Sequence, residues 1–296
     1  MATQVRGWKA FRVYLEMIKI EHSIFALPFA MIGMMWGSRS ALGTAWPGPW
    51  VFGWIVVAMV SCRSAAMAYN RIADREIDSR NDRTKMRAIP SGILQLRYAN
   101  LFFFVSCAIF FLSAFMLNRL ALLLSPIALF VTLFYSVTKR FTPLCHFVLG
   151  LSLGIAPAAA WIASTGTLSW TVVPLSAAVL CWTAGFDVIY SLQDESFDRE
   201  LRLRSIPQTV GKTKALWVSR ICHLCAVGLL VWSGLLVHAG PIYFAGVCAA
   251  ALLLLYEQSL VKADDLSKVN VAFFTLNGFV SMGLFAFALV DQLVRG

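Results

Sequence analysis

Residues 98–137 decide the fold, and they read YANLFFFVSCAIFFLSAFMLNRLALLLSPIALFVTLFYSV. Arg119 is the one charged residue in this stretch. A helix needs about 20 apolar residues to cross the ~30 Å hydrocarbon core of a bilayer. The stretch is therefore long enough for two crossings joined at Asn118 and Arg119. It predicts two successive transmembrane helices, with Pro126 inside the second.

The same composition extends along the whole chain. Of its 296 residues, 59% are hydrophobic and only 14% are charged, whereas a soluble domain is about a quarter charged. We therefore predict an all-α, polytopic membrane protein that forms a single intramembrane domain over residues 1–296. A hydropathy window of about 19 residues gives nine candidate spans, at residues 20–38, 50–69, 98–116, 119–137, 144–163, 170–190, 214–237, 241–261 and 269–291.

The placement of basic residues predicts the orientation. Most of the 25 lysines and arginines lie before the first span or in the loops on that same side. Positive loops face the cytoplasm, so we expect a cytoplasmic N-terminus and a C-terminus on the opposite side, as in a bacterial inner membrane protein. The formal net charge of +10 is then a topology signal, and we expect a lipid bilayer and no nucleic acid as its partner.

Two acidic clusters have one geometry. Asn70, Asp74 and Asp78 follow the second span at i, i+4 and i+8 spacing, which places them on one helix face. Asp194 and Asp198 follow the sixth span, and each lies 120 residues after its counterpart in the first cluster. Four spans separate the clusters, so both emerge on the same side. This pattern predicts two parallel four-helix halves plus one helix, with a shared site between the halves.

Carboxylates gathered at one membrane face need cations to neutralise them. The candidate ligands Asn70, Asp74, Asp78, Asp194 and Asp198 offer only oxygen atoms, which favours Mg²⁺. Mg²⁺ commonly bridges a few carboxylates to substrate phosphates. We therefore expect Mg²⁺ as the cofactor and a diphosphate as the ligand.

Basic residues beside the clusters could bind the phosphate oxygens. Arg63 lies inside the second span, seven residues before Asn70, and a buried arginine usually lines a cavity. The other basic candidates lie in loops on the acidic side, where they could instead only set topology. The predicted diphosphate-binding residues are Arg63, Arg83, Lys85, Arg87, Lys139, Arg140 and Arg199.

The ordered motifs resemble the UbiA superfamily of intramembrane aromatic prenyltransferases over essentially the whole chain. They are Arg63-x6-Asn70-x3-Asp74-x3-Asp78, Arg83-Thr84-x2-Arg87-x2-Pro90-x-Gly92, Tyr135-Ser136-x2-Lys139-Arg140 and Tyr190-x3-Asp194-x3-Asp198. The opening His22-Ser23-Ile24-Phe25-Ala26-Leu27-Pro28 resembles members that prenylate 4-hydroxybenzoate. Many members have Asp where this chain has Arg71, which weakens the transfer of substrate identity.

The resemblance implies Mg²⁺-dependent transfer of a polyprenyl group from polyprenyl diphosphate to an aromatic ring carbon, in ubiquinone or menaquinone biosynthesis. A small aromatic acid, 4-hydroxybenzoate first, is the expected acceptor, with a naphthoate as the alternative and haem as a weaker one. A transporter also suits nine spans and buried charge, but transporters usually bind near the midplane. The residues expected to meet or orient the acceptor are Tyr135, Asp187, Tyr190, Lys19 and His22.

Overall fold

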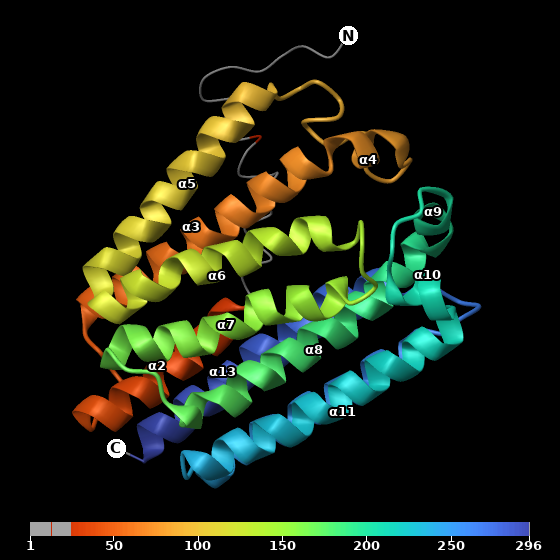
Figure 1. Cartoon of the computed structure of the whole chain (residues 1–296). Helices are drawn as coiled ribbons and strands as arrows, with labels where there is room; N and C mark the ends of the chain where they lie inside the picture. Colours follow the sequence, from red (N-terminus) through yellow and green to blue (C-terminus); the bar gives the residue numbers. More distant parts are fainter. Residues whose placement is uncertain (1–12, 14–24, 296) are drawn as a thin grey trace.

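The computed structural model describes residue 13 and residues 25–295, and every regular element in that part of the chain is helical. Nine long helices make up the bundle there (Figure 1). Their bounds are α2 (Leu27–Leu42), α3 (Pro49–Ala73), α5 (Leu96–Leu117), α6 (Arg119–Thr138), α7 (Cys145–Thr165), α8 (Val173–Ser191), α11 (Lys212–Leu236), α12 (Pro241–Leu260) and α13 (Asn277–Val294).

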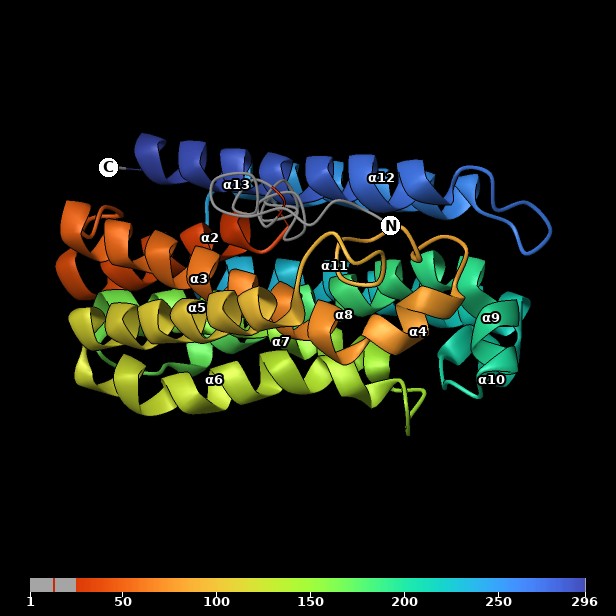
Figure 2. The same ribbon diagram turned by 90° about the horizontal axis from the view of Figure 1, so that it is seen from above.

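Short elements connect these helices. They are α4 (Arg75–Arg80), the 3₁₀ turns Trp170–Val172 and Leu192–Asp194, α9 (Glu195–Glu200), α10 (Ile206–Val210) and a π-helix, Val271–Leu276, that leads into α13. Figure 2 shows α12 and α13 along one side of the bundle and α6 along the opposite side.

Eight helical segments in the described part are long and apolar enough to cross a membrane. The all-helical membrane fold is thus confirmed, while the count of nine is approximate. The predicted first span, 20–38, corresponds to α2, which has only 16 residues and begins at Leu27. Large apolar side chains are exposed along the outer helices, including Leu123, Phe130 and Leu255. An outer surface of this kind suits lipid.

Glycines allow the inner helices to pack backbone against backbone. A Cβ atom at Gly33 of α2 would overlap the carbonyl group of Pro157 in α7. Gly150 of α7 lies equally close to the carbonyl of Leu180 in α8. Small residues four apart permit this approach in membranes, where no hydrophobic force draws helices together. These contacts fix α7 between α2 and α8.

The two acidic clusters coincide with two equivalent breaks in the chain. α3 ends at Ala73 and α4 starts at Arg75, so Asp74 lies between two helices. The spacing had predicted one continuous helix here, and that prediction is wrong. Asp194 likewise precedes α9, and α4 and α9 have the same length of six residues at an offset of 120. α4 and α9 lie toward the same end of the bundle (Figure 1), which is the arrangement expected of parallel repeats.

Candidate active site

A cavity of about 1300 Å³ opens between the helices at the end that carries the acidic clusters. Its polar rim includes Asp74, Asp78 and Asp194, whereas apolar residues such as Met59 and Leu153 line the deeper part. A ligand with an anionic head and an apolar tail would match this division.

Asp74 forms the centre of the first acidic cluster. Its Oδ2 accepts a hydrogen bond from Asn70 Nδ2 at 2.9 Å, and its Oδ1 accepts one from Arg140 Nη2 at 3.3 Å. Arg140 also donates to the carbonyl of Ala73 at 2.7 Å, at the end of α3. Burial raises the pKa of Asp74, and the Arg140 guanidinium opposes that rise. The turn that follows α6 thereby positions the end of α3.

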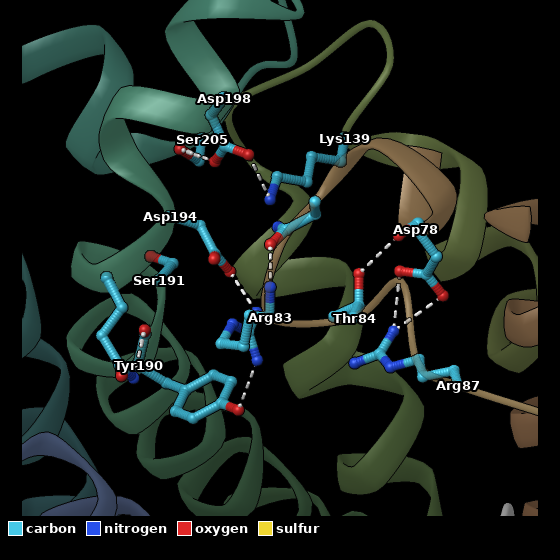
Figure 3. Close-up of polar contacts among 12 residues, drawn as sticks. Asp78, Arg83, Thr84, Arg87, Lys139, Tyr190, Ser191, Asp194, Asp198 and Ser205 are labelled. Carbon is cyan, nitrogen blue, oxygen red and sulfur yellow. Dashed lines mark hydrogen bonds and ion pairs between the residues drawn. The ribbon is translucent and has the colours of Figure 1, made fainter. Parts of the chain in front are cut away.

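Asp78 is held by the loop that follows α4. Arg87 Nη1 lies 2.8 Å from both carboxylate oxygens of Asp78. The hydroxyl of Thr84 donates to the Asp78 carbonyl at 3.1 Å. This loop therefore folds back over its own acidic cluster, as Figure 3 shows.

The second cluster pairs with basic residues from the first half of the chain. Arg83 Nη2 lies 2.7 Å from Asp194 Oδ2, and Lys139 Nζ lies 2.6 Å from Asp198 Oδ1 (Figure 3). Ser205 Oγ donates to the other oxygen of Asp198 at 2.9 Å. The two halves are thus joined by ion pairs across the mouth of the cavity.

The donor set fits a magnesium diphosphate. Mg²⁺ needs one or two carboxylates when substrate phosphates and water complete its coordination, and the four aspartates supply oxygen ligands alone. Within the described residues, no three His, Cys, Asp or Glu side chains converge closely enough to hold a metal by themselves. Each aspartate instead faces a lysine or arginine. The arrangement suits a cation that arrives together with the diphosphate.

Most of the predicted site residues reach the cavity. Lys85 does not line it, because it pairs with the exposed Asp82 at 2.5 Å. Arg199 pairs with Glu195 at 2.5 Å, also outside the cavity wall, and Asp198 lies buried behind Lys139. Lys19 and His22 lie outside the described residues. The predicted residues that line the cavity are Arg63, Asn70, Asp74, Asp78, Arg83, Arg87, Tyr135, Lys139, Arg140, Asp187, Tyr190 and Asp194.

Two arginines of α3 lie in the cavity wall. Arg63 is about two turns from Asn70, and its Nε is buried with no hydrogen-bond partner among the described residues. Arg71 Nη1 donates to Asn70 Oδ1 at 3.3 Å. Unsatisfied buried donors are costly, so Arg63 is suited to an anionic ligand.

Aromatic rings lie beside the acidic rim. The ring centroids of Tyr190 and Phe273 are 4.1 Å apart, and those of Phe186 and Phe273 are 5.2 Å apart. Phe273 belongs to the π-helix before α13, a feature often found at functional sites that the uniformly apolar sequence did not reveal. His146 and Ser205 were also missed, because single polar residues near apolar runs usually only pack.

Together, the fold and the site define a helical membrane protein with a charged rim over an apolar, lipid-sized cavity. The chain belongs to the UbiA prenyltransferase family, whose model matches residues 26–281. The protein is therefore a transferase.

Its curated relatives match most of the chain. It is 29% identical to a 4-hydroxybenzoate octaprenyltransferase of Shewanella pealeana, over 96% of this chain and 97% of that protein. A 4-hydroxybenzoate octaprenyltransferase of Nitrosospira multiformis is 32% identical, over 81% of this chain and 82% of that one.

Solved structures have the same fold. A UbiA homologue from Aeropyrum pernix is 36% identical with a TM-score of 0.83, over 92% of this chain and 98% of that one. A homologue from Archaeoglobus fulgidus, bound to GPP and Mg²⁺, has a TM-score of 0.73 at 18% identity, over 95% of this chain and 99% of that one.

Proposed function

We propose that this protein transfers a polyprenyl group from polyprenyl diphosphate to a ring carbon of 4-hydroxybenzoate, with Mg²⁺ as cofactor and diphosphate as the leaving group. The observation that carries the proposal is the rim of Asp74, Asp78 and Asp194, with Asp198 buried behind Lys139, over an apolar cavity of about 1300 Å³. Each of these aspartates faces a lysine or arginine. The names of the two curated relatives support this acceptor. We further propose that the reaction belongs to ubiquinone biosynthesis.

The rim residues divide the work of binding the diphosphate. Mg²⁺ would be held by Asp74, Asp78, Asp194 and Asp198 with Asn70. When bound, it would neutralise the diphosphate and favour its departure. Basic side chains that now face these carboxylates would turn to the phosphate oxygens, where they stabilise the charge of the leaving group. They are Arg83, Arg87, Lys139 and Arg140.

The cavity would accommodate the rest of the reaction. The prenyl tail would lie among apolar residues such as Met59 and Leu153. The faces of Tyr190 and Phe273 could shield an allylic cation through their π electrons. Arg63 could meet the carboxylate of the acceptor. We place the N-terminus and the acidic rim on the cytoplasmic side of a bacterial inner membrane, and the C-terminus on the other.

The test is prenyl transfer by the purified protein in detergent with a labelled allylic diphosphate and Mg²⁺. 4-Hydroxybenzoate and a dihydroxynaphthoate are supplied in parallel, with EDTA as the metal-free control. We expect a prenylated 4-hydroxybenzoate that does not form in EDTA. Product formed from the naphthoate alone would make a naphthoate the acceptor in place of 4-hydroxybenzoate. If no diphosphate is released with either acid, aromatic transfer to these acids is overturned.

A further inference from the structure

A histidine–aspartate pair lies in the cavity wall away from the acidic rim. His146, near the start of α7, and Asp187, on α8, both line the cavity. His146 Nδ1 lies 2.7 Å from Asp187 Oδ2, and the histidine side chain is 2% exposed. Asp187 keeps 15% of its side chain exposed, so the carboxylate is accessible from the cavity and the imidazole is behind it.

The second hydrogen bond of the imidazole defines its tautomer. The backbone N–H of Ile206, in the first turn of α10, donates to His146 Nε2 at 3.3 Å. Because Nε2 accepts, the proton of a neutral imidazole is on Nδ1, which then donates to Asp187. The ring is therefore held at both nitrogens, and it presents a fixed donor to one oxygen of the carboxylate.

Asp187 differs from every other carboxylate in the described cavity wall. Asp74, Asp78 and Asp194 each face an arginine, whereas Asp187 pairs with His146. Its other oxygen, Oδ1, has no hydrogen-bond partner among the described residues. Asp187 is consequently the one carboxylate of the described wall that is oriented by a histidine and not paired with an arginine, and its Oδ1 is left open to the acceptor.

We propose that Asp187 is the base that accepts the proton released during prenyl transfer, and that His146 is a positioning residue that orients it. This inference rests on the proposed function. The C–O bond to the diphosphate breaks, and its electron pair leaves with the diphosphate. Ring π electrons form the new C–C bond to the allylic carbon. The C–H bond at that ring carbon then breaks, its electrons restore the aromatic ring, and the proton passes to Asp187 Oδ1.

The arrangement follows a common design in which a third group orients the base. Removing the orienting hydrogen bond leaves the carboxylate free to rotate away from the acceptor, so proton removal slows while binding of the diphosphate at the rim is unaffected. Asn at position 146 can place an amide N–H close to the position of Nδ1, whereas Leu cannot donate. These two variants separate the hydrogen bond from the bulk of the side chain.

The experiment measures transfer by Asp187→Asn, His146→Leu, His146→Asn and the control His223→Asn. His223 is another buried histidine, on α11, and it does not line the cavity. Each variant is assayed with 4-hydroxybenzoate and with the same acid deuterated at both ring carbons beside the hydroxyl. Binding of the labelled prenyl diphosphate with Mg²⁺ reports that the rim is intact.

We expect Asp187→Asn to lower the transfer rate by about 10²–10⁴, the usual contribution of a general base, with unchanged diphosphate binding. His146→Leu should slow transfer at least about tenfold and raise the isotope effect above the wild-type value, because proton removal becomes the slow step. His146→Asn should restore both, and His223→Asn should match the wild type.

Three results would overturn the inference. One is a wild-type rate for Asp187→Asn. Another is a His146→Leu variant that transfers slowly but keeps the wild-type isotope effect. The third is an equal loss of transfer and of diphosphate binding in all the site variants, which would indicate a structural role. A wild-type protein that prenylates no aromatic acid would instead overturn the proposed function itself.

Discussion

Arg83 Nη2 lies 2.7 Å from Asp194 Oδ2, and this contact ties the loop after α4 to the start of α9. The same guanidinium donates to the Tyr190 hydroxyl at 3.0 Å. Arg83 belongs to the first half of the chain and Asp194 to the second. The residue thus connects the two acidic clusters at the point where the diphosphate would enter between them.

Arg83→Ala should weaken prenyl diphosphate binding and lower the transfer rate. The guanidinium has two partners in the site, and in the complex we expect it to bind the phosphate oxygens, a charge-assisted contact about twice as strong as a neutral hydrogen bond. Titration with a labelled prenyl diphosphate in Mg²⁺ measures the affinity. Lys85→Ala is the matched control, because Lys85 pairs with Asp82 outside the cavity. Equal losses in the two variants would contradict a specific role for Arg83.

Asp74→Ala and Asp194→Ala should each abolish transfer while leaving the protein inserted and folded. Each removes a proposed metal ligand from one half of the site, and the other half cannot neutralise the diphosphate alone. Transfer is assayed over a range of Mg²⁺ concentrations, with circular dichroism as the check on folding. Mg²⁺-dependent transfer retained by both variants would rule out this assignment of the ligands.

The helices could be predicted from the sequence because length and hydropathy alone identify a membrane span. The predicted span 50–69 and the helix α3, Pro49–Ala73, differ by only a few residues. The break at Asp74 could not be predicted, since a helical face of the form i, i+4, i+8 reads the same with or without an interruption. The π-helix at Val271–Leu276 was likewise hidden in an apolar run.

Residues of the candidate site could be predicted where charged residues repeat along the sequence. They could not be predicted where a single side chain depends on a contact that forms only in the folded protein. The 120-residue offset identified Asp74 and Asp194 together, because four carboxylates at one membrane face need cations to neutralise them. Nothing local distinguishes His146 from a packed histidine. The proposed role of His146 depends on its hydrogen bonds to Asp187 and to the backbone of Ile206. These residues are distant from His146 in the sequence and adjacent to it only in the folded protein.

Arg71→Asp should be tolerated better than the loss of Asp74. Arg71 contributes one hydrogen bond of 3.3 Å to Asn70, whereas Asp74 contacts both Asn70 and Arg140. We expect a modest fall in transfer, measured beside Asp74→Ala at saturating Mg²⁺. If Arg71→Asp is as inactive as Asp74→Ala, then the arginine at this position has a function of its own in this chain.

Gly33→Ala should destabilise the protein by about 1–3 kcal/mol, the usual cost of overpacking. The added methyl group would overlap the carbonyl of Pro157, and backbone cannot move aside as a flexible side chain can. Thermal unfolding in one detergent compares this variant with Gly53→Ala, where a Cβ would meet nothing within 4 Å. Similar unfolding midpoints for the two variants would mean that α2 and α7 separate easily.

Asn277→Leu should destabilise the second half of the bundle more than a surface change would. Asn277 is fully buried, accepts a hydrogen bond from Trp182 Nε1 at 2.7 Å and donates to Glu257 Oε1 at 3.1 Å. Leucine leaves both partners unpaired in an apolar interior, which costs about 1–3 kcal/mol for each group. Ser233→Ala is the control, because that hydroxyl bonds only within its own helix. Asn277 also donates to the carbonyl of Ala272 in the π-helix at 3.0 Å. The same substitution should therefore shift Phe273 and slow transfer. A destabilised variant with undiminished activity would show that the π-helix is held by other contacts.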